Sequence, residues 1–127
     1  MAGNLSNYLE NKLIDHFLGT AAYTMPTTIY VALYSVAPTD SGGGTQLTGG
    51  SYARQLATFS ASSSGATSNS SNIDFTGMPA ATTVAIGIFD AITSGNLLLW
   101  GTLTTNKTTD AGDTLRIATG DLDISID

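Results

Sequence analysis

Side chains able to perform acid–base, nucleophilic or metal chemistry are scarce in this sequence. It contains no cysteine, one histidine, His16, and four basic residues, Lys12, Arg54, Lys107 and Arg116. General acid–base catalysis by histidine needs a second group placed beside it. No such partner stands at a recognisable spacing from His16, so we expect it at the boundary of an apolar helix face. The sequence therefore predicts a structural or binding protein with no catalytic residues and no cofactor.

The acidic residues of the last third are the remaining candidates for a ligand set. They are Asp110, Asp113, Asp121, Asp123 and Asp127. Asp121 and Asp123 are spaced like two ligands of a calcium loop, but the glycine and final glutamate of that loop are absent. We interpret these residues as turn and surface positions and predict no metal site. A weakly bound ion at an oligomer interface is the alternative.

Glycine clusters precede the first arginine of the chain. The run of residues 42–44 and the pair Gly49 and Gly50 lack the lysine and the strand–loop–helix order of a phosphate-binding loop. They indicate a hinge or a loop with unusual backbone angles. Arg54 follows on an otherwise neutral strand, where an isolated charge is costly to bury. We therefore expect Arg54 to pair with a carboxylate, with a role at an interface as the sharper hypothesis.

Aromatic residues offer one further binding chemistry. A stacking platform for sugars or bases could use Tyr8, Tyr23, Tyr30, Tyr34, Tyr52 and Trp100. Aromatic residues on strands more often belong to the core. Trp100 is the candidate if the chain is a glycan-binding module.

Composition narrows the classes of partner. The chain has 127 residues, of which only 11% are charged, and a net charge of −6. Four scattered cations are too few for direct nucleic-acid binding or for attraction to an anionic membrane. No segment reaches the ~20 apolar residues of a membrane span, and no signal peptide is visible. A surface so poor in charge favours assembly into oligomers or larger particles.

The elements that must position these residues follow from periodicity. Apolar residues recur every four positions at the start, which predicts an amphipathic helix over about residues 5–18, capped by Asn4 or Ser6 and ended by Gly19. The strongest strand covers residues 28–36, with alternate residues facing two apolar sides. Further strands are expected at 52–59, 72–75, 83–89, 97–104, 114–118 and 122–126. The serine-rich run 60–71 is either a linker or a surface strand, and 105–112 is expected to be a connection.

Short strands joined by Gly, Asp and Asn turns predict a mainly β fold. We expect an antiparallel β-sandwich or jelly-roll-like domain with one N-terminal amphipathic helix. The length favours a single domain over residues 1–127. Within it, residues 1–24 form the helix and arm, and residues 25–127 form the sandwich.

Six segments in order carry a resemblance to a known family. They are the helix from Ser6 to His16, the strand from Ile29 to Tyr34, and the segments 49–55, 87–91, 94–101 and 111–115. Together they resemble small tailed-phage virion proteins, commonly labelled phage tail fibre or minor structural proteins. The resemblance implies a location in the virion, capsid or tail, after synthesis in the host cytoplasm. It implies no enzymatic activity and no catalytic residues.

Two structural functions compete within that resemblance. A single small β domain with a helical arm is the usual build of a capsid decoration, or cement, protein, which is the function we expect. A tail-associated subunit, such as a tail fibre or minor tail protein, is the alternative, and a glycan-binding surface module is less favoured. The expected partners are copies of the chain, as a homotrimer or other homo-oligomer, and the major capsid protein or tail proteins. The predicted assembly residues are Leu5, Leu9, Leu13, Phe17, Gly43, Gly49 and Arg54.

Overall fold

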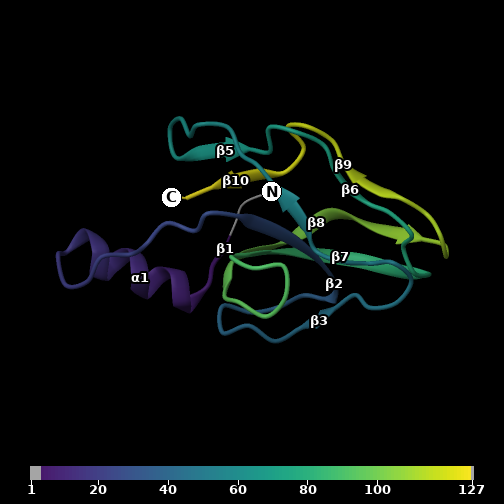
Figure 1. Ribbon diagram of the computed structural model, residues 1–127, viewed down its shortest axis with the longest axis horizontal. Helices are drawn as coiled ribbons and strands as arrows, with labels where there is room; N and C mark the ends of the chain where they lie inside the picture. The colour runs from purple at the N-terminus through teal and green to yellow at the C-terminus, as the bar shows by residue number, and fades with distance from the viewer. Residues whose placement is uncertain (1–3, 127) are drawn as a thin grey trace.

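The computed structural model describes residues 4–126, which form one helix and ten strands (Figure 1). The helix α1 spans Asn7–Phe17. The strands are β1 Asn4–Leu5, β2 Ile29–Val36, β3 Thr45–Gln46, β4 Gln55–Ala57, β5 Ala66–Ser68, β6 Ile73–Phe75, β7 Ala81–Phe89, β8 Leu97–Thr109, β9 Leu115–Ile117 and β10 Asp123–Ser125. All strand pairs are antiparallel. The predicted mainly β class with one helix near the N-terminus is confirmed.

Six strands form one large sheet in the order β1-β8-β7-β2-β3, with β4 also paired to β2. Its centre is the pair β2 and β7, where Val31 lies opposite Ile88 and Leu33 opposite Ile86. These strands are rich in β-branched residues, which suit a pleated and buried surface. Between Thr83 and Ala85 the register against β8 shifts, so that residues 103–106 of β8 lie opposite Val84 alone.

The second layer consists of two short two-stranded sheets, β5 with β10 and β6 with β9. Both lie over the same side of the large sheet (Figure 1). Between the layers is the main core, in which Val31, Leu33, Ile86 and Ile88 of the large sheet meet Phe75 and other apolar residues of the second layer. The sandwich is thus built from one six-stranded sheet and a second layer of two separate small sheets, which we call the cover.

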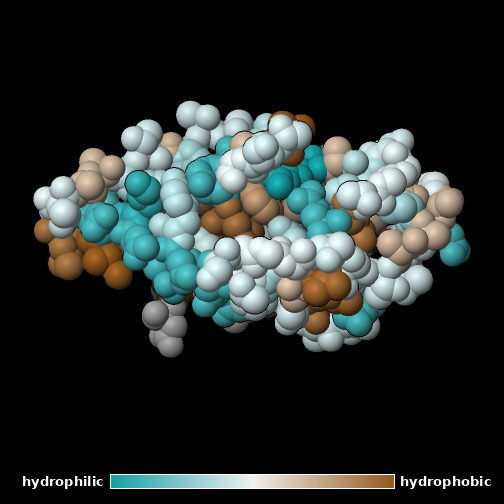
Figure 2. All heavy atoms as spheres, turned by 90° about the horizontal axis from the view of Figure 1, so that it is seen from below, coloured by the Kyte–Doolittle hydropathy of each residue, from teal (hydrophilic) through white to brown (hydrophobic). Residues whose placement is uncertain are grey.

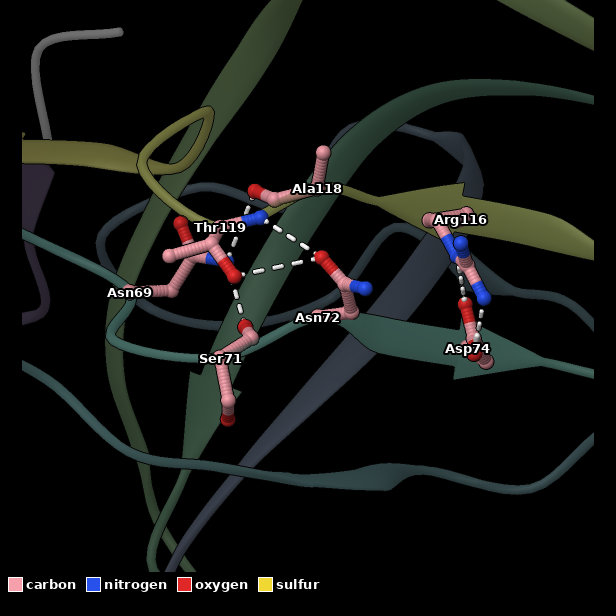
Figure 3. A network of polar contacts seen from close by, with 7 residues as sticks. All are labelled: Asn69, Ser71, Asn72, Asp74, Arg116, Ala118 and Thr119. Atoms are coloured by element: carbon pink, nitrogen blue, oxygen red, sulfur yellow. Dashed lines mark hydrogen bonds and ion pairs between the residues drawn. The ribbon is translucent and has the colours of Figure 1, made fainter.

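Hydrogen bonds of polar side chains connect the segments of the second layer to one another, as Figure 3 shows. Asn69 is 1% exposed. Its Nδ2 donates to the carbonyl oxygens of Ser71 and Ala118 at 2.8 and 2.9 Å. Its Oδ1 accepts from the backbone N–H groups of Gly120 and Leu122 at 3.1 and 2.9 Å. Because every polar atom of this buried amide is used, Asn69 fixes the irregular segments that join the strands of the cover.

The opposite side of the large sheet has a much smaller apolar cluster. Its buried members are Ala32, Tyr34, Ala85 and Phe89. Gly87 lies in the same area, and a Cβ at this position would come within 3.2 Å of Tyr34, Leu97 and Phe89 side-chain atoms. The expectation that β2 has two apolar faces is therefore confirmed, although only one face is covered by a strand layer.

The helix is attached at its first turn and projects from the sheets (Figure 1). Ser6 is the N-cap, as one of the two predicted candidates, and its Oγ accepts from the Leu9 N–H at 3.2 Å. The Ser6 N–H donates to the Leu98 carbonyl at 2.8 Å, and the Asn7 N–H donates to the Asp40 carbonyl at 2.9 Å. Gly19, with φ +76°, follows the helix end as expected.

Three predicted boundaries were wrong. The helix begins at Asn7, because Leu5 pairs with Leu99 as part of β1. The connection predicted at 105–112 begins only after Thr109, because the threonine-rich segment continues β8. The strand predicted at 52–59 is reduced to Gln55–Ala57. Within the serine-rich run, residues 66–68 form the surface strand β5.

Candidate functional site

A hollow of about 500 Å³ lies on the side of the large sheet that has no strand cover. Its walls come from the first turn of α1, the loop after β2, and the connection between β7 and β8. The lining residues include Ser6, Asn7, Tyr8, Tyr34, Asp40, Gly42, Gly43, Gly44, Gln46, Arg54, Phe89, Asn96 and Leu97. Two predicted site residues, Gly43 and Arg54, thus meet at one place although they are distant in sequence.

Arg54 forms the charged wall of the hollow. Its Nη1 donates to the carbonyl oxygens of Ala91 and Ser94 at 3.0 and 2.8 Å. Its Nη2 donates to Gln46 Oε1 at 3.1 Å. The guanidinium carbon lies 3.5 Å from the centre of the Phe89 ring, which is a cation–π contact.

The predicted pairing of Arg54 with a carboxylate was wrong. Among the described residues, the only ion pair joins Arg116 to Asp74. Asp90 acts on Arg54 electrostatically, but its two carboxylate oxygens accept from the Asn96 backbone N–H and Nδ2 at 2.7 and 2.9 Å. Carbonyl dipoles and the aromatic ring therefore stabilise the guanidinium in place of an opposite charge.

Burial has opposite consequences for the two ionisable groups of this wall. It lowers the pKa of Arg54, an effect that nearby Tyr34, Tyr52 and Asp90 oppose. It raises the pKa of Tyr34, which the positive charge of Arg54 partly counteracts. Arginine retains its proton at neutral pH even so, and tyrosine remains a neutral hydroxyl.

Two tyrosines near the hollow differ in how their hydroxyls are used. The Tyr52 hydroxyl accepts from the Leu33 N–H at 2.9 Å and from Gln46 Nε2 at 3.0 Å. Tyr34 is 4% exposed and lines the hollow, and its hydroxyl is not among the buried polar atoms that lack a partner within residues 4–126. Sequence analysis did not single out Gln46, which bridges Arg54 and Tyr52, because no local pattern distinguishes it from other polar residues of a loop.

A second feature is apolar surface at the far end of α1. Ile14, Phe17, Leu18 and Met25 are exposed by 55, 74, 78 and 80%, and we call this group the α1 tip. Figure 2 shows hydrophobic side chains gathered at the end of the molecule that α1 forms. Ile14, Phe17 and Leu18 lie at the end of α1, and Met25 lies in the segment that follows it. Exposed apolar residues that gather in one region are typical of interaction sites.

The other predicted assembly residues lie elsewhere. Leu9 is buried within its own chain, Leu13 is half-buried, and Leu5 belongs to β1. Only Phe17 of the predicted helix residues is part of the α1 tip. Gly49, with φ +104°, lies beside a separate hollow on another side of Arg54.

The remaining candidates have local roles. His16 Nδ1 accepts from the Tyr23 N–H at 3.1 Å, which fixes the chain as it returns along the helix. Asp113 Oδ2 accepts from the Asp110 N–H at 2.8 Å, as expected for a turn. The half-buried Trp100 donates from Nε1 to Asp40 Oδ1 at 2.9 Å. Across the described part of the chain, no group of three or more His, Cys, Asp or Glu could hold a metal ion.

No helix among residues 4–126 is long and apolar enough to cross a membrane. Fold and surface together define a small mainly β protein with an exposed apolar helix end. Residues 4–125 match the family described as podophage GP4 fiber I protein gp80. The chain belongs to this family, which confirms the resemblance to phage virion structural proteins and makes it a phage fibre-type structural protein. No curated protein matches the chain.

Proposed function

We propose that the chain is a non-enzymatic subunit of a phage tail fibre that assembles with copies of itself through the α1 tip. The observation that carries this proposal is the exposure of three large apolar side chains at one end of a helix attached by its other end, and of Met25 in the segment that follows. Isolated apolar residues on a surface are ordinary, but a group of this size on a projecting element needs a partner to exclude water. The family description supports a fibre.

Low charge also supports self-association. Charged residues are 11% of the sequence, compared with about 25% in typical soluble proteins. Neighbouring copies with few charges on their contacting surfaces lose little solvation energy when they meet. The partner that best fits the α1 tip is therefore the same element of another copy, in line with the homotrimer or other homo-oligomer expected from sequence.

The test compares two leucine substitutions of identical chemistry. Leu18 lies in the α1 tip, whereas Leu56 is also exposed, by 54%, but lies on β4. Sedimentation velocity of the purified protein should show an oligomer that dissociates in Leu18→Ser and persists in Leu56→Ser. A wild-type protein that stays monomeric at high concentration, or an oligomer unaffected by Leu18→Ser, would contradict the proposal.

Capsid decoration remains the second candidate function. It is favoured by the build of the molecule, a small β body with a helix that could reach a neighbouring subunit. The number of copies in purified particles, measured by gel densitometry, separates the two functions. A copy number close to that of the major capsid protein indicates decoration, and one restricted to the tail indicates a fibre subunit.

A further inference from the structure

We propose that a second cavity, between the large sheet and the cover, binds a small neutral molecule with an apolar body and one hydrogen-bonding group, such as an aromatic alcohol. We call it the interlayer cavity. It lies outside the hollow beside Arg54 and outside the α1 tip, so the inference is independent of the assembly function proposed above. It depends on three features: an apolar lining, a buried hydroxyl without a partner, and balanced charge at the rim.

The first feature is the lining of the interlayer cavity. Its volume of about 400 Å³ lies in the range of small-molecule sites, about 300–1,000 Å³. Both layers contribute apolar side chains, from β2, β7 and β8 on one side and from β9 and the segment after it on the other: Leu33, Ile86, Leu103, Leu115, Ile117 and Leu122. Because apolar cavities are poor sites for water and take up apolar molecules, this lining favours a ligand with an apolar body.

The second feature is the hydroxyl of Thr83, a residue that also lines the interlayer cavity. Thr83 is 1% exposed, and its Oγ1 is the one buried side-chain polar atom among residues 4–126 that has no hydrogen-bond partner. Such groups are rare in proteins, because an unpartnered buried hydroxyl is costly. A threonine hydroxyl can act as donor or acceptor, so a ligand with one hydrogen-bonding atom would supply the missing partner.

The register shift in β7 explains why a threonine lies among these apolar residues. Ala81 packs against the main core before the shift, and Ile86 and Ile88 do so after it, so the alternation of side chains changes phase between Thr83 and Ala85. Thr83 therefore lines the same cavity as Ile86. The cavity and the unpartnered hydroxyl thus occur at the same irregularity of the large sheet.

The third feature is the charge at the rim of the interlayer cavity. The charged residues that line it are all exposed, and they comprise two cations, Lys107 and Arg116, and two anions, Asp113 and Asp121. Opposite charges in equal number give little attraction for an ion of either sign. An ion that entered the apolar interior would also lose its hydration without gaining a partner of opposite charge. Both conditions favour a neutral ligand.

The experiment is an NMR titration of the ¹⁵N-labelled full chain with benzyl alcohol and, separately, with toluene, which has the same carbon skeleton without the hydroxyl. Benzyl alcohol should cause saturable shifts of the backbone amides of Thr83, Leu115 and Ile117. Absence of saturable shifts overturns the proposal. Shifts confined to the α1 tip also overturn it, because they would show an apolar probe adsorbed to exposed side chains.

Two threonine variants test the role of the hydroxyl without disturbing the fold. Thr83→Val keeps the shape of the side chain and removes an Oγ1 that has no partner within residues 4–126. The affinity for benzyl alcohol should therefore fall about tenfold, whereas the affinity for toluene should not fall. Thr82→Val is the matched control and should change neither affinity, because Thr82 lies on the same strand but does not line the cavity. Unchanged affinity for benzyl alcohol in Thr83→Val, or equal losses for both probes, would contradict a contact between ligand and hydroxyl.

Discussion

The two faces of the large sheet differ in how they are covered. Alternate residues of β2 and β7 contribute to a broad apolar core under the second layer, and the intervening ones to a small cluster beside the hollow. The covered face therefore carries most of the hydrophobic stabilisation, which scales with apolar area removed from water. The other face keeps polar groups near solvent. One set of strands thus contributes to a large core on one face and to a small cluster beside the hollow on the other, according to which face each side chain points to.

The two arginines, Arg116 and Arg54, also lie in contrasting environments. Arg116 is exposed and donates to both carboxylate oxygens of Asp74 on the outside of the cover, at 2.7 and 3.0 Å, as Figure 3 shows. Arg54 is partly buried, is bound by neutral oxygens, and stacks on Phe89. An exposed ion pair is surrounded by water and contributes little to stability. The partly buried guanidinium instead links Gln46 to the connection between β7 and β8 through its hydrogen bonds.

The largest expected effect concerns the covered face. Phe75→Ala should lower the free energy of unfolding by about 3–5 kcal/mol, because it opens a cavity in the main core. Phe75 is 1% exposed and stacks on Tyr52 with the ring centres 6.0 Å apart. Urea unfolding followed by circular dichroism measures the change. Phe17→Ala is the control: this ring is 74% exposed, so we expect a change within about 0.5 kcal/mol. Similar losses in both variants would contradict the division between core and surface.

The next effect tests how closely the small apolar cluster is packed on the face without a strand cover. Gly87→Ala should lower the free energy of unfolding by about 1–3 kcal/mol, because the new methyl group would lie 2.9 Å from Tyr34 and 3.0 Å from Leu97. Without this crowding, a Gly→Ala change on a permissive backbone would stabilise by about 0.4–1 kcal/mol. The sign of the change in urea unfolding therefore decides whether the small cluster is closely packed.

A smaller effect is expected at a buried hydroxyl without a hydrogen-bond partner on the covered face. Thr83 is 1% exposed, and its Oγ1 lacks a hydrogen-bond partner where the register of β7 and β8 shifts. Thr83→Val should raise the free energy of unfolding by about 1 kcal/mol, because valine has the same shape without an unsatisfied hydroxyl. Thr109→Val should lower it by a similar amount, because the Thr109 hydroxyl donates to the Pro79 carbonyl at 2.8 Å. Thermal unfolding of both variants checks the contrast, and equal signs would refute it.

The smallest effect is expected at the exposed ion pair. Asp74→Asn should leave the urea midpoint at pH 7 unchanged within error, and added salt should not alter this result. The hydrogen bonds from Arg116 lower the pKa of Asp74. Any contribution is thus fully present above the ordinary value of about 3.9 and is lost as the pH falls through the lowered one. A midpoint difference that grows on acidification would oppose this sign.

Periodic patterns made the regular elements predictable. The four-residue recurrence located the helix to within two residues at its start, and alternation in β2 separated the residues of its two faces. The Ser6 cap and the Gly19 end also followed from local chemistry. Such features depend on neighbours in sequence, so a single sequence contains them.

The hollow was not predictable, because it depends on contacts between distant residues. Two of the acceptors of Arg54 are the backbone carbonyls of Ala91 and Ser94. Because every residue has a backbone carbonyl, the residue type does not indicate such a contact. The role of Gln46, which bonds to both Tyr52 and Arg54, is equally invisible in the sequence. The exposure of Ile14 and Leu18 depends on how far the helix projects, which its own periodicity does not determine.

Because Trp100 is hydrogen-bonded to Asp40, its fluorescence reports on the border of the hollow. Trp100 is the only tryptophan in the sequence, so the indole fluorescence of the intact protein arises from one site. Emission from a half-buried indole changes with its polarity and hydrogen bonding. Movements of the loop at Asp40 can thus be followed by the wavelength and lifetime of tryptophan emission in the purified, unlabelled protein.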